Sequence, residues 1–460
     1  MKIIQFILLL AISQNVLGQT RDEAAIRQIY NKALSEGKTY SLLDNLCNKI
    51  GPRLSGSPGA AAAVEWSRHV MEDFGFDSVW LQPVMVPHWV RGQKEIGRVV
   101  NSKKMGVVEL NVCALGGSVG TGPDGVSASI VEVKNFEELA QLGAKNVQGK
   151  IVFFNRPMDA TLINTFAAYS GANNQRSRGP SEAAKYGAVA VIVRSMGSNL
   201  EDYPHTGGLR YDPNVTKIPA VAIATRHAEL LSKLLKDDKS LQFYLESHCE
   251  ILEDAPSFNV IGQLNGSEYK DEYIVVGGHL DSWDLAQGAH DDGSGCVQSI
   301  EVLRIFSSMG YKPKRTIRAV MFMNEENGGR GGQKYAELAL KNKEKHIAAI
   351  ESDRGGFTPR GFTMTTTDAS KKKIQSWKPL LEPYGLTDFG SEGGGADIGP
   401  LGPQGTALIG YYPDSQRYFD YHHTPVDTFD KINKRELELG AASMAALVYL
   451  LDQYGLGDKN

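Results

Sequence analysis

Imidazole and carboxylate side chains gather directly after four short apolar segments in the C-terminal half of this sequence. They occur in the order His279-x-Asp281, Asp291-Asp292, Glu325-Glu326, Asp353 and His423. Each signal alone is weak, because Asp-Asp-Gly commonly marks a turn or a helix cap and a Glu pair is ordinarily solvated. Together they indicate a shared cation, since carboxylates brought to one place repel one another unless a positive charge neutralises them.

Such a mixture of imidazole and carboxylate ligands is typical of zinc, which can keep open positions for water and substrate. Neighbouring polar residues are expected to have other roles. His290 and His422 each precede a candidate ligand by one residue, and we interpret both as structural. Asp284 and Asp292 are interpreted as loop and cap residues. The pattern therefore favours a zinc centre as the chemistry of this chain.

Alternating strands and helices must position these residues. The expected strands are Tyr273–Gly277, Thr316–Met323, Ile347–Ile350 and Ala407–Tyr411. The expected helices are Gly293–Met309, Gly332–Lys341, Ser370–Tyr384 and Lys434–Tyr454. This alternation predicts an α/β fold with a mostly parallel sheet sandwiched by helices. Because ligands bind beyond the carboxyl ends of parallel strands, the polar groups should meet at one edge of the sheet.

The first half of the chain has a different texture. Two helices, Ala24–Leu34 and Gly59–Phe74, and a strand, Phe76–Val86, are expected near its start. Short Val- and Ile-rich runs then follow, such as Val107–Ala114 and Ala220–Ile223, without a His, Asp and Glu cluster in ligand spacing. We expect these runs to form a separate β-rich domain without chemistry. The predicted domains are 19–99 and 256–460 for the catalytic part and 100–255 for the β-rich part.

The order of the motifs resembles that of the zinc exopeptidases that comprise dizinc aminopeptidases and glutamate carboxypeptidases. Within this family the chain is most similar to the carboxypeptidase Q branch, on the strength of Gly277–Asp284, Glu351–Asp353 and Gly51–Pro58. The segment 100–255 resembles the protease-associated domain that is inserted ahead of the family's metal core. The resemblance covers nearly all of the chain after its first 18 residues.

The resemblance implies two zinc ions and a metal-activated water that hydrolyses dipeptides or short peptides. It implies that His279 and Asp353 hold one zinc, that Glu326 and His423 hold the other, and that Asp291 bridges both.

Further roles come from the same resemblance. Glu325 would be the general base, and Asp281 would orient a ligand imidazole. A cis peptide bond would join Asp291 to Asp292. The resemblance also suggests a homodimer.

A glycine-rich segment, Ser391–Asp397, lies between the fourth and fifth ligands in sequence. It could form a substrate-contacting loop or a plain connection, and Asp397 is a candidate contact for a free amino terminus. Some family members use a tyrosine to donate to the oxyanion, and the candidates here are Tyr411, Tyr412 and Tyr421.

Composition limits the partners and the compartment. The 460 residues include 49 Lys and Arg against 53 Asp and Glu, so the chain has no basic excess for nucleic acid. The start reads as a signal peptide over residues 1–18, whose apolar run Ile3–Ile12 is shorter than a membrane span. We therefore expect an exported protein without a membrane span after cleavage, with a single anchor as the alternative.

Four other readings stay open. One is an aminopeptidase of the same family, since one or two hydrogen bonds decide that preference. Another is a related enzyme that cyclises amino-terminal glutamine with one zinc ion. A third is a receptor-type relative without catalysis. The last is a module that binds peptide or glycan through residues 100–255 alone.

Overall fold

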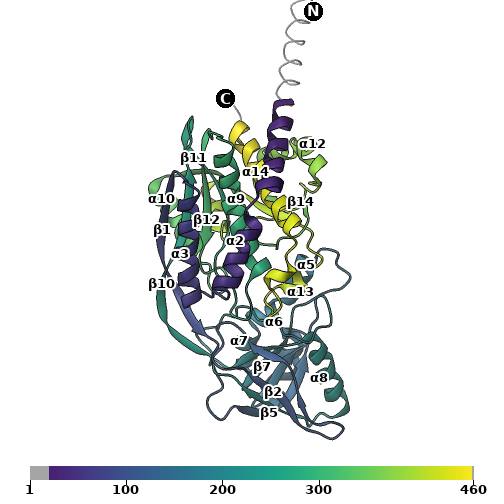
Figure 1. The fold of residues 1–460 in the computed structure, drawn as a ribbon. Helices are drawn as coiled ribbons and strands as arrows, with labels where there is room; N and C mark the ends of the chain where they lie inside the picture. Colours follow the sequence, from purple (N-terminus) through teal and green to yellow (C-terminus); the bar gives the residue numbers. More distant parts are fainter. Residues whose placement is uncertain (1–19, 458–460) are drawn as a thin grey trace, which may run out of the picture.

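Two β-sheets organise the computed structural model, which describes residues 20–457 (Figure 1). The first sheet has seven strands, in the order β1 (Ser78–Val90), β10 (Glu250–Leu264), β12 (Arg315–Phe322), β11 (Tyr269–His279), β13 (Lys345–Glu351), β15 (Ala407–Pro413) and β14 (Pro359–Thr365). The strands β12, β11, β13 and β15 are parallel, and antiparallel strands complete both sides. The predicted α/β class with a mixed, partly parallel sheet is confirmed.

The register of the parallel strands brings their carboxyl ends to one edge. His279 at the end of β11 pairs with Phe322 of β12, and Gly277 pairs with Glu351 of β13. Glu351 pairs in turn with Gly410 of β15. The residues that follow each strand therefore emerge side by side, as the strand pattern predicts.

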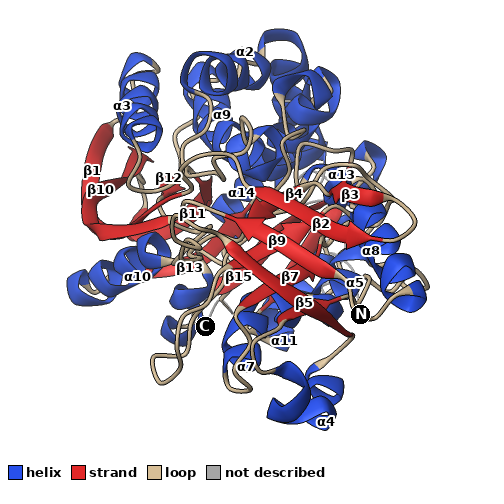
Figure 2. Ribbon diagram, turned by 90° about the horizontal axis from the view of Figure 1, so that it is seen from below, coloured by secondary structure: helices blue, strands red, loops and turns tan. Residues whose placement is uncertain are grey.

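Helices cover both faces of this sheet (Figure 2). One face buries a large apolar cluster under a helix over residues 20–36 and under α2 (Thr39–Asn45), α3 (Pro58–Asp73), α9 (Ser294–Ser308) and α14 (Lys434–Tyr454). The other face packs against α10 (Arg330–Asn342) and the 3₁₀ helix η4 (Gly399–Gln404) through Tyr335, Ala336 and Leu401. This burial on two sides explains why the parallel strands are almost continuously apolar.

The second sheet has eight strands, and residues 96–246, which carry it, are called the inserted unit below. Its strand order is β3 (Gly106–Glu109), β2 (Ile96–Ser102), β9 (Gln242–Glu246), β5 (Val126–Val133), β6 (Ile151–Phe154), β7 (Ala190–Arg194), β8 (Ala220–Ile223) and β4 (Val112–Ala114). Its helices are α4 (Phe136–Val147), α5 (Thr165–Ala172), α6 (Asn174–Ser177), α7 (Gly179–Ala184) and α8 (Thr225–Asp237).

The contacts that attach the inserted unit to the rest of the chain include a strand ribbon and an apolar cluster. The antiparallel ribbon of β1 and β10 runs down to it and ends with Val90 paired to Glu250 (Figure 1). An apolar cluster of the unit also takes in Phe357 and the residues Tyr418, Phe419 and Tyr421 of α13 (Tyr418–Tyr421). The carboxyl edge of the first sheet therefore faces the inserted unit.

Several predicted elements differ from the observed ones. The expected strand Val107–Ala114 is two strands, because the chain turns at Leu110 and Asn111 and places β3 and β4 at opposite edges of the second sheet. The expected helix Ser370–Tyr384 is broken into α11 (Asp368–Gln375), α12 (Lys378–Leu381) and the 3₁₀ turn η3 (Glu382–Tyr384). Pro379 and Pro383 explain the break, since proline lacks the N–H that an α-helix requires.

Irregular turns complete the chain of elements. They are the π-helical turns η1 (Leu46–Ile50) and η2 (Ala289–Gly293) and the 3₁₀ turn η5 (Phe429–Lys431).

The four cysteines are all buried and unpaired, and Cys296 fits the prediction of a buried thiol. Within residues 20–457, no helix combines the length and the apolar character that a bilayer span requires. The predicted signal peptide, residues 1–18, lies outside the described residues.

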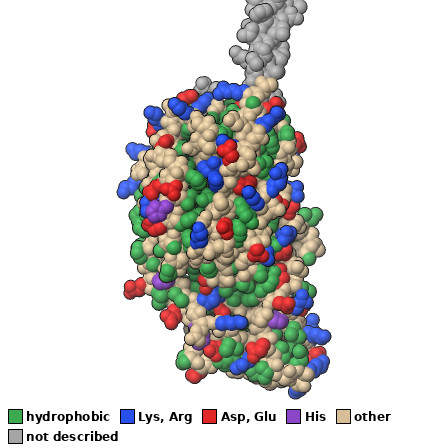
Figure 3. Space-filling view, viewed as in Figure 1, with side chains coloured by type: hydrophobic (Ala, Val, Ile, Leu, Met, Phe, Trp, Pro, Cys, Tyr) green, Lys and Arg blue, Asp and Glu red, His purple; other side chains and the backbone are tan. Residues whose placement is uncertain are grey.

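Charged side chains of both signs are mixed on the face shown in Figure 3. This mixture on the visible face is in keeping with the small formal net charge of −4.

Candidate functional site

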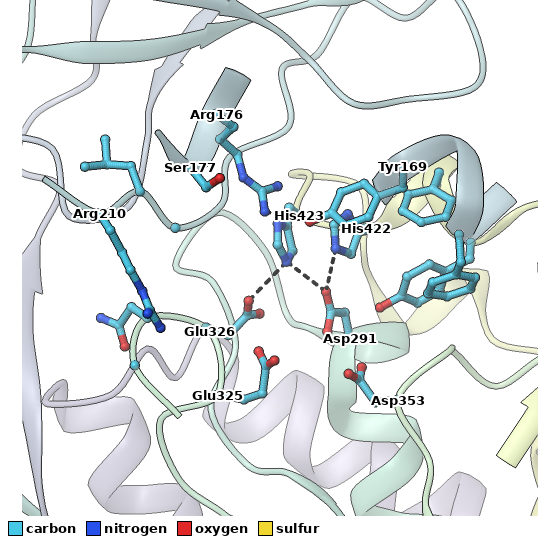
Figure 4. Close-up of a pocket in the computed structure, with 17 residues that line it drawn as sticks. Tyr169, Arg176, Ser177, Arg210, Asp291, Glu325, Glu326, Asp353, His422 and His423 are labelled. Carbon is cyan, nitrogen blue, oxygen red and sulfur yellow. Dashed lines mark hydrogen bonds and ion pairs between the residues drawn. The ribbon is translucent and has the colours of Figure 1, made fainter. Parts of the chain in front are cut away.

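Five side chains predicted as metal ligands meet beyond the carboxyl edge of the first sheet (Figure 4). His279 ends β11, Glu326 follows β12 and Asp353 follows β13. Asp291 comes from the irregular turn η2, and His423 from the segment after α13. Four strands and the turn that leads into α9 thus supply one cluster, because the parallel register aligns their ends.

Asp291 lies at the centre of this cluster. Its Oδ1 is 3.1 Å from Nε2 of His279, and its Oδ2 is 3.3 Å from Nε2 of His423. Asp353 approaches the His279 ring at 3.5 Å, and Glu326 approaches the His423 ring at 3.1 Å. The two oxygens of one carboxylate therefore face two separate imidazole–carboxylate pairs.

The donor set fits divalent cations. His279, Asp291 and Glu326 offer atoms that all lie within 4.8 Å of one another, and so do two further groups, His279 with Asp292 and Asp353, and Asp291 with His422 and His423. Within residues 20–457, Glu326 Oε1 is buried and has no hydrogen-bond partner. A buried carboxylate oxygen without a partner is costly unless something positive binds it. These residues could hold zinc, which binds nitrogen and oxygen donors of this kind.

The pKa shifts of two imidazoles in the cluster also indicate that positive charge is favoured there. Burial alone would lower the pKa of His423, but Glu326 and Asp291 raise it to about 10. Burial would likewise lower the pKa of His279, yet Asp291 and Asp353 raise it well above its usual value. The carboxylates thus favour positive charge at this place, and a divalent cation would supply it.

Glu325 lies beside the cluster with its carboxylate in the cavity wall (Figure 4). Burial, followed by the charges of Asp353 and Glu326, raises the pKa of Glu325 well above its usual value. A carboxyl group with a raised pKa next to a metal centre has the character of a general base.

Asp281 is fully buried, and its carboxylate binds backbone N–H groups more closely than the His279 imidazole that it was predicted to orient. The nearest partner of His279 Nδ1 is the backbone carbonyl of Asp281, at 2.9 Å, while the Asp281 carboxylate lies 3.9 Å away. That carboxylate instead accepts the backbone N–H groups of Asn324, Glu325 and Glu326 at 2.7, 3.1 and 3.3 Å. It therefore anchors the loop that carries the candidate base and a candidate ligand.

The neighbouring polar residues mostly have the structural roles expected of them. The Asp292 carboxylate accepts the backbone N–H groups of Gly295 and His279, at 2.9 and 3.1 Å, and so caps α9. His290 stacks on Phe357 and Tyr421, and burial lowers its pKa to about 3. The peptide bond between Asp291 and Asp292 is cis, as the resemblance implies.

His422 comes nearer to the metal cluster than predicted. Its ring stacks on His423 with centroids 3.5 Å apart, and its Nε2 lies 3.9 Å from Asp291. His423 contacts both Asp291 and Glu326 more closely, so His423 remains the better candidate ligand.

The predicted substrate contact at Asp397 gains no support from the structure. Asp397 is buried and is not among the residues that line the cavity. The oxyanion candidates Tyr411, Tyr412 and Tyr421 do not line it either, whereas Tyr169 and Tyr418 do. Sequence reasoning missed these two tyrosines because it considered only tyrosines within the strand Ala407–Tyr411 or directly next to it and to the pair His422-His423.

The cavity next to the cluster has a volume of about 330 Å³, at the lower end of the range for small-molecule sites. Its lining includes Phe166, Tyr169, Arg176, Ser177 and Arg210 of the inserted unit. Residues 100–255, which were expected to carry no chemistry, therefore contribute to the wall of this cavity. The ligand-spacing criterion could not detect this contribution, because these residues are not metal ligands.

The match to known sequences decides the family. Residues 259–448 match the model of peptidase family M28. The chain is 34% identical to carboxypeptidase Q of Bos taurus over 423 residues, which is 92% of this chain and 86% of the relative, and carboxypeptidase Q of Homo sapiens is equally similar over the same shares. The chain belongs to peptidase family M28.

Solved M28 structures agree with this assignment. The chain resembles a peptidase M28 precursor from Shewanella amazonensis with a TM-score of 0.88 and 34% identity, over 94% of this chain and 97% of the other. A zinc aminopeptidase from Bacillus subtilis shares the fold, with a TM-score of 0.64 at 21% identity over 89% and 94% of the two chains. The predicted resemblance is confirmed, and the chain is a zinc metallopeptidase.

Proposed function

We propose that this M28 peptidase is an exported dizinc exopeptidase that hydrolyses dipeptides or short peptides. The observation that carries the proposal is the position of Asp291, whose two oxygens face the His279–Asp353 pair and the His423–Glu326 pair. One carboxylate with a pair on each side is the arrangement that two bridged cations require. Export is proposed from the signal-like start of the sequence.

The mechanism follows from the placement of the chain's own groups. Bound zinc would lower the pKa of a water molecule and polarise the scissile carbonyl. Glu325 takes the proton of the attacking water and passes it to the leaving amine. Asp281 holds the loop that carries Glu325 and Glu326 by accepting their backbone N–H groups. The inserted unit closes one side of the cavity and limits the length of the substrate.

A homodimer is part of the proposal because the family resemblance suggests it. The ribbon of β1 and β10 carries exposed apolar side chains at Met85, Val90, Ile251 and Leu252, which would suit a subunit contact. Light scattering of the purified chain would give its mass in solution, and a monomeric mass would remove this part of the proposal.

Elemental analysis combined with a dipeptide panel tests the central claim. We expect two zinc ions per chain, hydrolysis of dipeptides with free termini, and loss of activity with a chelator that zinc reverses. Asp291→Asn should lose both ions, whereas His423→Gln should lose one. One zinc per wild-type chain, together with cyclisation of amino-terminal glutamine, would contradict the proposal and favour the single-zinc alternative.

A further inference from the structure

The segment Gly51–Gly56, called the brace below, has no regular secondary structure but is mostly buried. It belongs to the motifs shared with the family, yet none of its residues lines the cavity or joins a candidate metal group. Two of its side chains, Arg53 and Ser55, are only 0% and 1% exposed. Polar side chains buried to this degree need partners, and these two find theirs on the loops that carry the candidate ligands and base.

Arg53 binds both ends of the loop between β11 and the turn η2. Its Nε donates to the carbonyl oxygen of Leu280 at 2.6 Å, and its Nη1 and Nη2 donate to those of residues 287 and 288 at 2.5 and 2.9 Å. This loop begins directly after His279 and ends shortly before Asp291. One planar guanidinium with donors in three directions thus ties together the backbone beside two candidate ligands.

A carboxylate holds the turn η2 from its other side. Asp427 accepts the backbone N–H groups of His290 and Asp291 at 2.8 and 3.1 Å. The backbone of η2 departs from helical angles at Asp291 and Asp292, so the turn depends on side chains for bonds that a regular helix forms within itself. Arg53 on the carbonyl groups and Asp427 on the amides therefore stabilise the same turn with opposite charges.

Ser55 binds the second loop, which follows β12. Its hydroxyl donates to Oδ1 of Asn327 at 2.7 Å and accepts from Nδ2 of Asn324 at 2.9 Å. Asn324 has a φ of 77°, a left-handed conformation that is uncommon outside glycine and persists where the surroundings hold it. Glu325 and Glu326 follow directly in sequence. The Ser55 hydroxyl therefore supports the loop that carries the candidate base and a candidate ligand.

The brace is itself fixed by its neighbours. Leu54 belongs to a buried cluster with Trp89 and Trp283. On the other side, Gly59 of α3 faces the Pro52 carbonyl so closely that a Cβ atom at this position would lie 2.1 Å from the oxygen. A larger residue at position 59 would displace the brace. Close packing on two sides makes this irregular segment a rigid support.

We propose that the brace positions the metal cluster and the candidate base through two side chains. Arg53 places His279 and Asp291 relative to one another, and Ser55 places the loop 324–327. The inference rests on the proposed function, because it assigns zinc to the cluster. Arg53 and Ser55 are positioning residues, since each acts through a loop and touches neither the cavity nor a ligand side chain. Supports of this kind orient ligands before the metal binds.

Zinc affinity and hydrogen exchange test the role of Arg53. Arg53→Lys keeps a cationic side chain but loses the fork that reaches three carbonyl groups. Competition against a chelating indicator should show zinc affinity reduced roughly 10- to 100-fold. Exchange at the amides of residues 288–291 should become faster in the metal-free chain. Arg304→Lys, at another buried arginine that pairs with Glu301 on α9, is the matched control and should change neither quantity.

Turnover and thermal stability test the role of Ser55. Ser55→Ala removes the hydroxyl and leaves the packing, so kcat should fall roughly 10-fold with KM unchanged. Ser57→Ala is the matched control, because the Ser57 side chain caps α3 by accepting the Ala60 N–H at 3.1 Å. Loss of this cap should lower Tm and leave kcat as in the wild type. A merely structural role of Ser55 would likewise change Tm alone.

Either of two results would overturn the inference. One is a folded Arg53→Lys chain with wild-type zinc affinity and exchange, and the other is wild-type kcat for Ser55→Ala. If Arg53→Lys does not fold, Ser55→Ala decides, and a selective loss of kcat supports the brace. A wild type that binds no zinc or hydrolyses no peptide would contradict the proposed function instead. The exchange comparison requires neither property, so the two failures are distinguishable.

Discussion

Thr206 of the inserted unit and His423 of the catalytic part are joined by their backbones and by the histidine ring. The Thr206 N–H donates to the His423 carbonyl at 2.9 Å, and the Thr206 carbonyl oxygen lies 3.4 Å from His423 Nδ1. An acceptor at Nδ1 fixes the ring so that Nε2 faces Asp291 and Glu326. The inserted unit therefore orients a candidate metal ligand as well as lining the cavity.

Arg91 supports this contact, and its replacement should weaken zinc binding. Its guanidinium binds Asp284 at 2.6 and 2.8 Å and reaches the Ala114 carbonyl at 2.7 Å, which also accepts the Thr206 hydroxyl at 2.8 Å. Arg91→Lys loses the fork, so zinc affinity should fall roughly 10-fold. Competition against a chelating indicator would measure it, with Arg98→Lys, a change at a half-buried surface residue, as control. Equal affinities would contradict the role given to Thr206.

Glu325→Gln should remove the proton acceptor while leaving the shape of the site intact. We expect kcat to fall by about 10²- to 10⁴-fold with the zinc content unchanged, since Glu325 is assigned to proton transfer and not to the metal. Steady-state kinetics and elemental analysis of the same samples would check both points. Glu337→Gln, on the exposed side of α10, serves as control. Wild-type turnover by Glu325→Gln would rule out the mechanism.

Asp281→Asn should loosen the loop that carries Glu325 and Glu326. A carboxamide presents one acceptor oxygen, so it cannot hold all three backbone N–H groups that the carboxylate accepts. Activity should fall roughly 10- to 100-fold. Hydrogen exchange at the amides of residues 324–326 should become faster, and Asp430→Asn, at an exposed site, should change neither quantity. Unchanged exchange with reduced activity would favour the originally predicted role, orientation of His279.

His346 should make the fold less stable in acid. Burial, and then the charge of Arg318, lower the pKa of His346 to about 4, while an unfolded histidine titrates near 6.5. The unfolded chain therefore takes up a proton before the native chain does, and the free energy of unfolding falls as pH drops from about 6.5 to about 4. The loss amounts to roughly 3 kcal/mol.

Chemical denaturation across this pH range would measure the effect. His346→Gln should show a shallower decline than the wild type, because it cannot take up the proton on unfolding. His69→Gln, at an exposed position, should decline as the wild type does. A parallel decline of wild type and His346→Gln would contradict the prediction.

The local pattern of apolar residues in the sequence predicted correctly the elements that are buried along most of their length. The strand β8 and the long helix α14 have the bounds expected from the sequence, since β8 is buried throughout and α14 is largely buried. The strand β10 escaped prediction because its first residues are exposed and include the charged Glu250, Glu253 and Asp254, while its last residues are buried. Its pairing with β1 extends it beyond the apolar part, and such pairing leaves no local signal.

The sequence by itself determined the ligand types, their order and their position after the strands, because parallel strands bring their carboxyl ends to one edge. Only the tertiary structure decided that Thr206 lies against His423, 217 residues away in sequence, and that Arg176 is buried in the cavity wall without a carboxylate. The reason is physical. Local periodicity records which face of an element is buried, but the packing of the inserted unit against the catalytic part depends on contacts between distant segments.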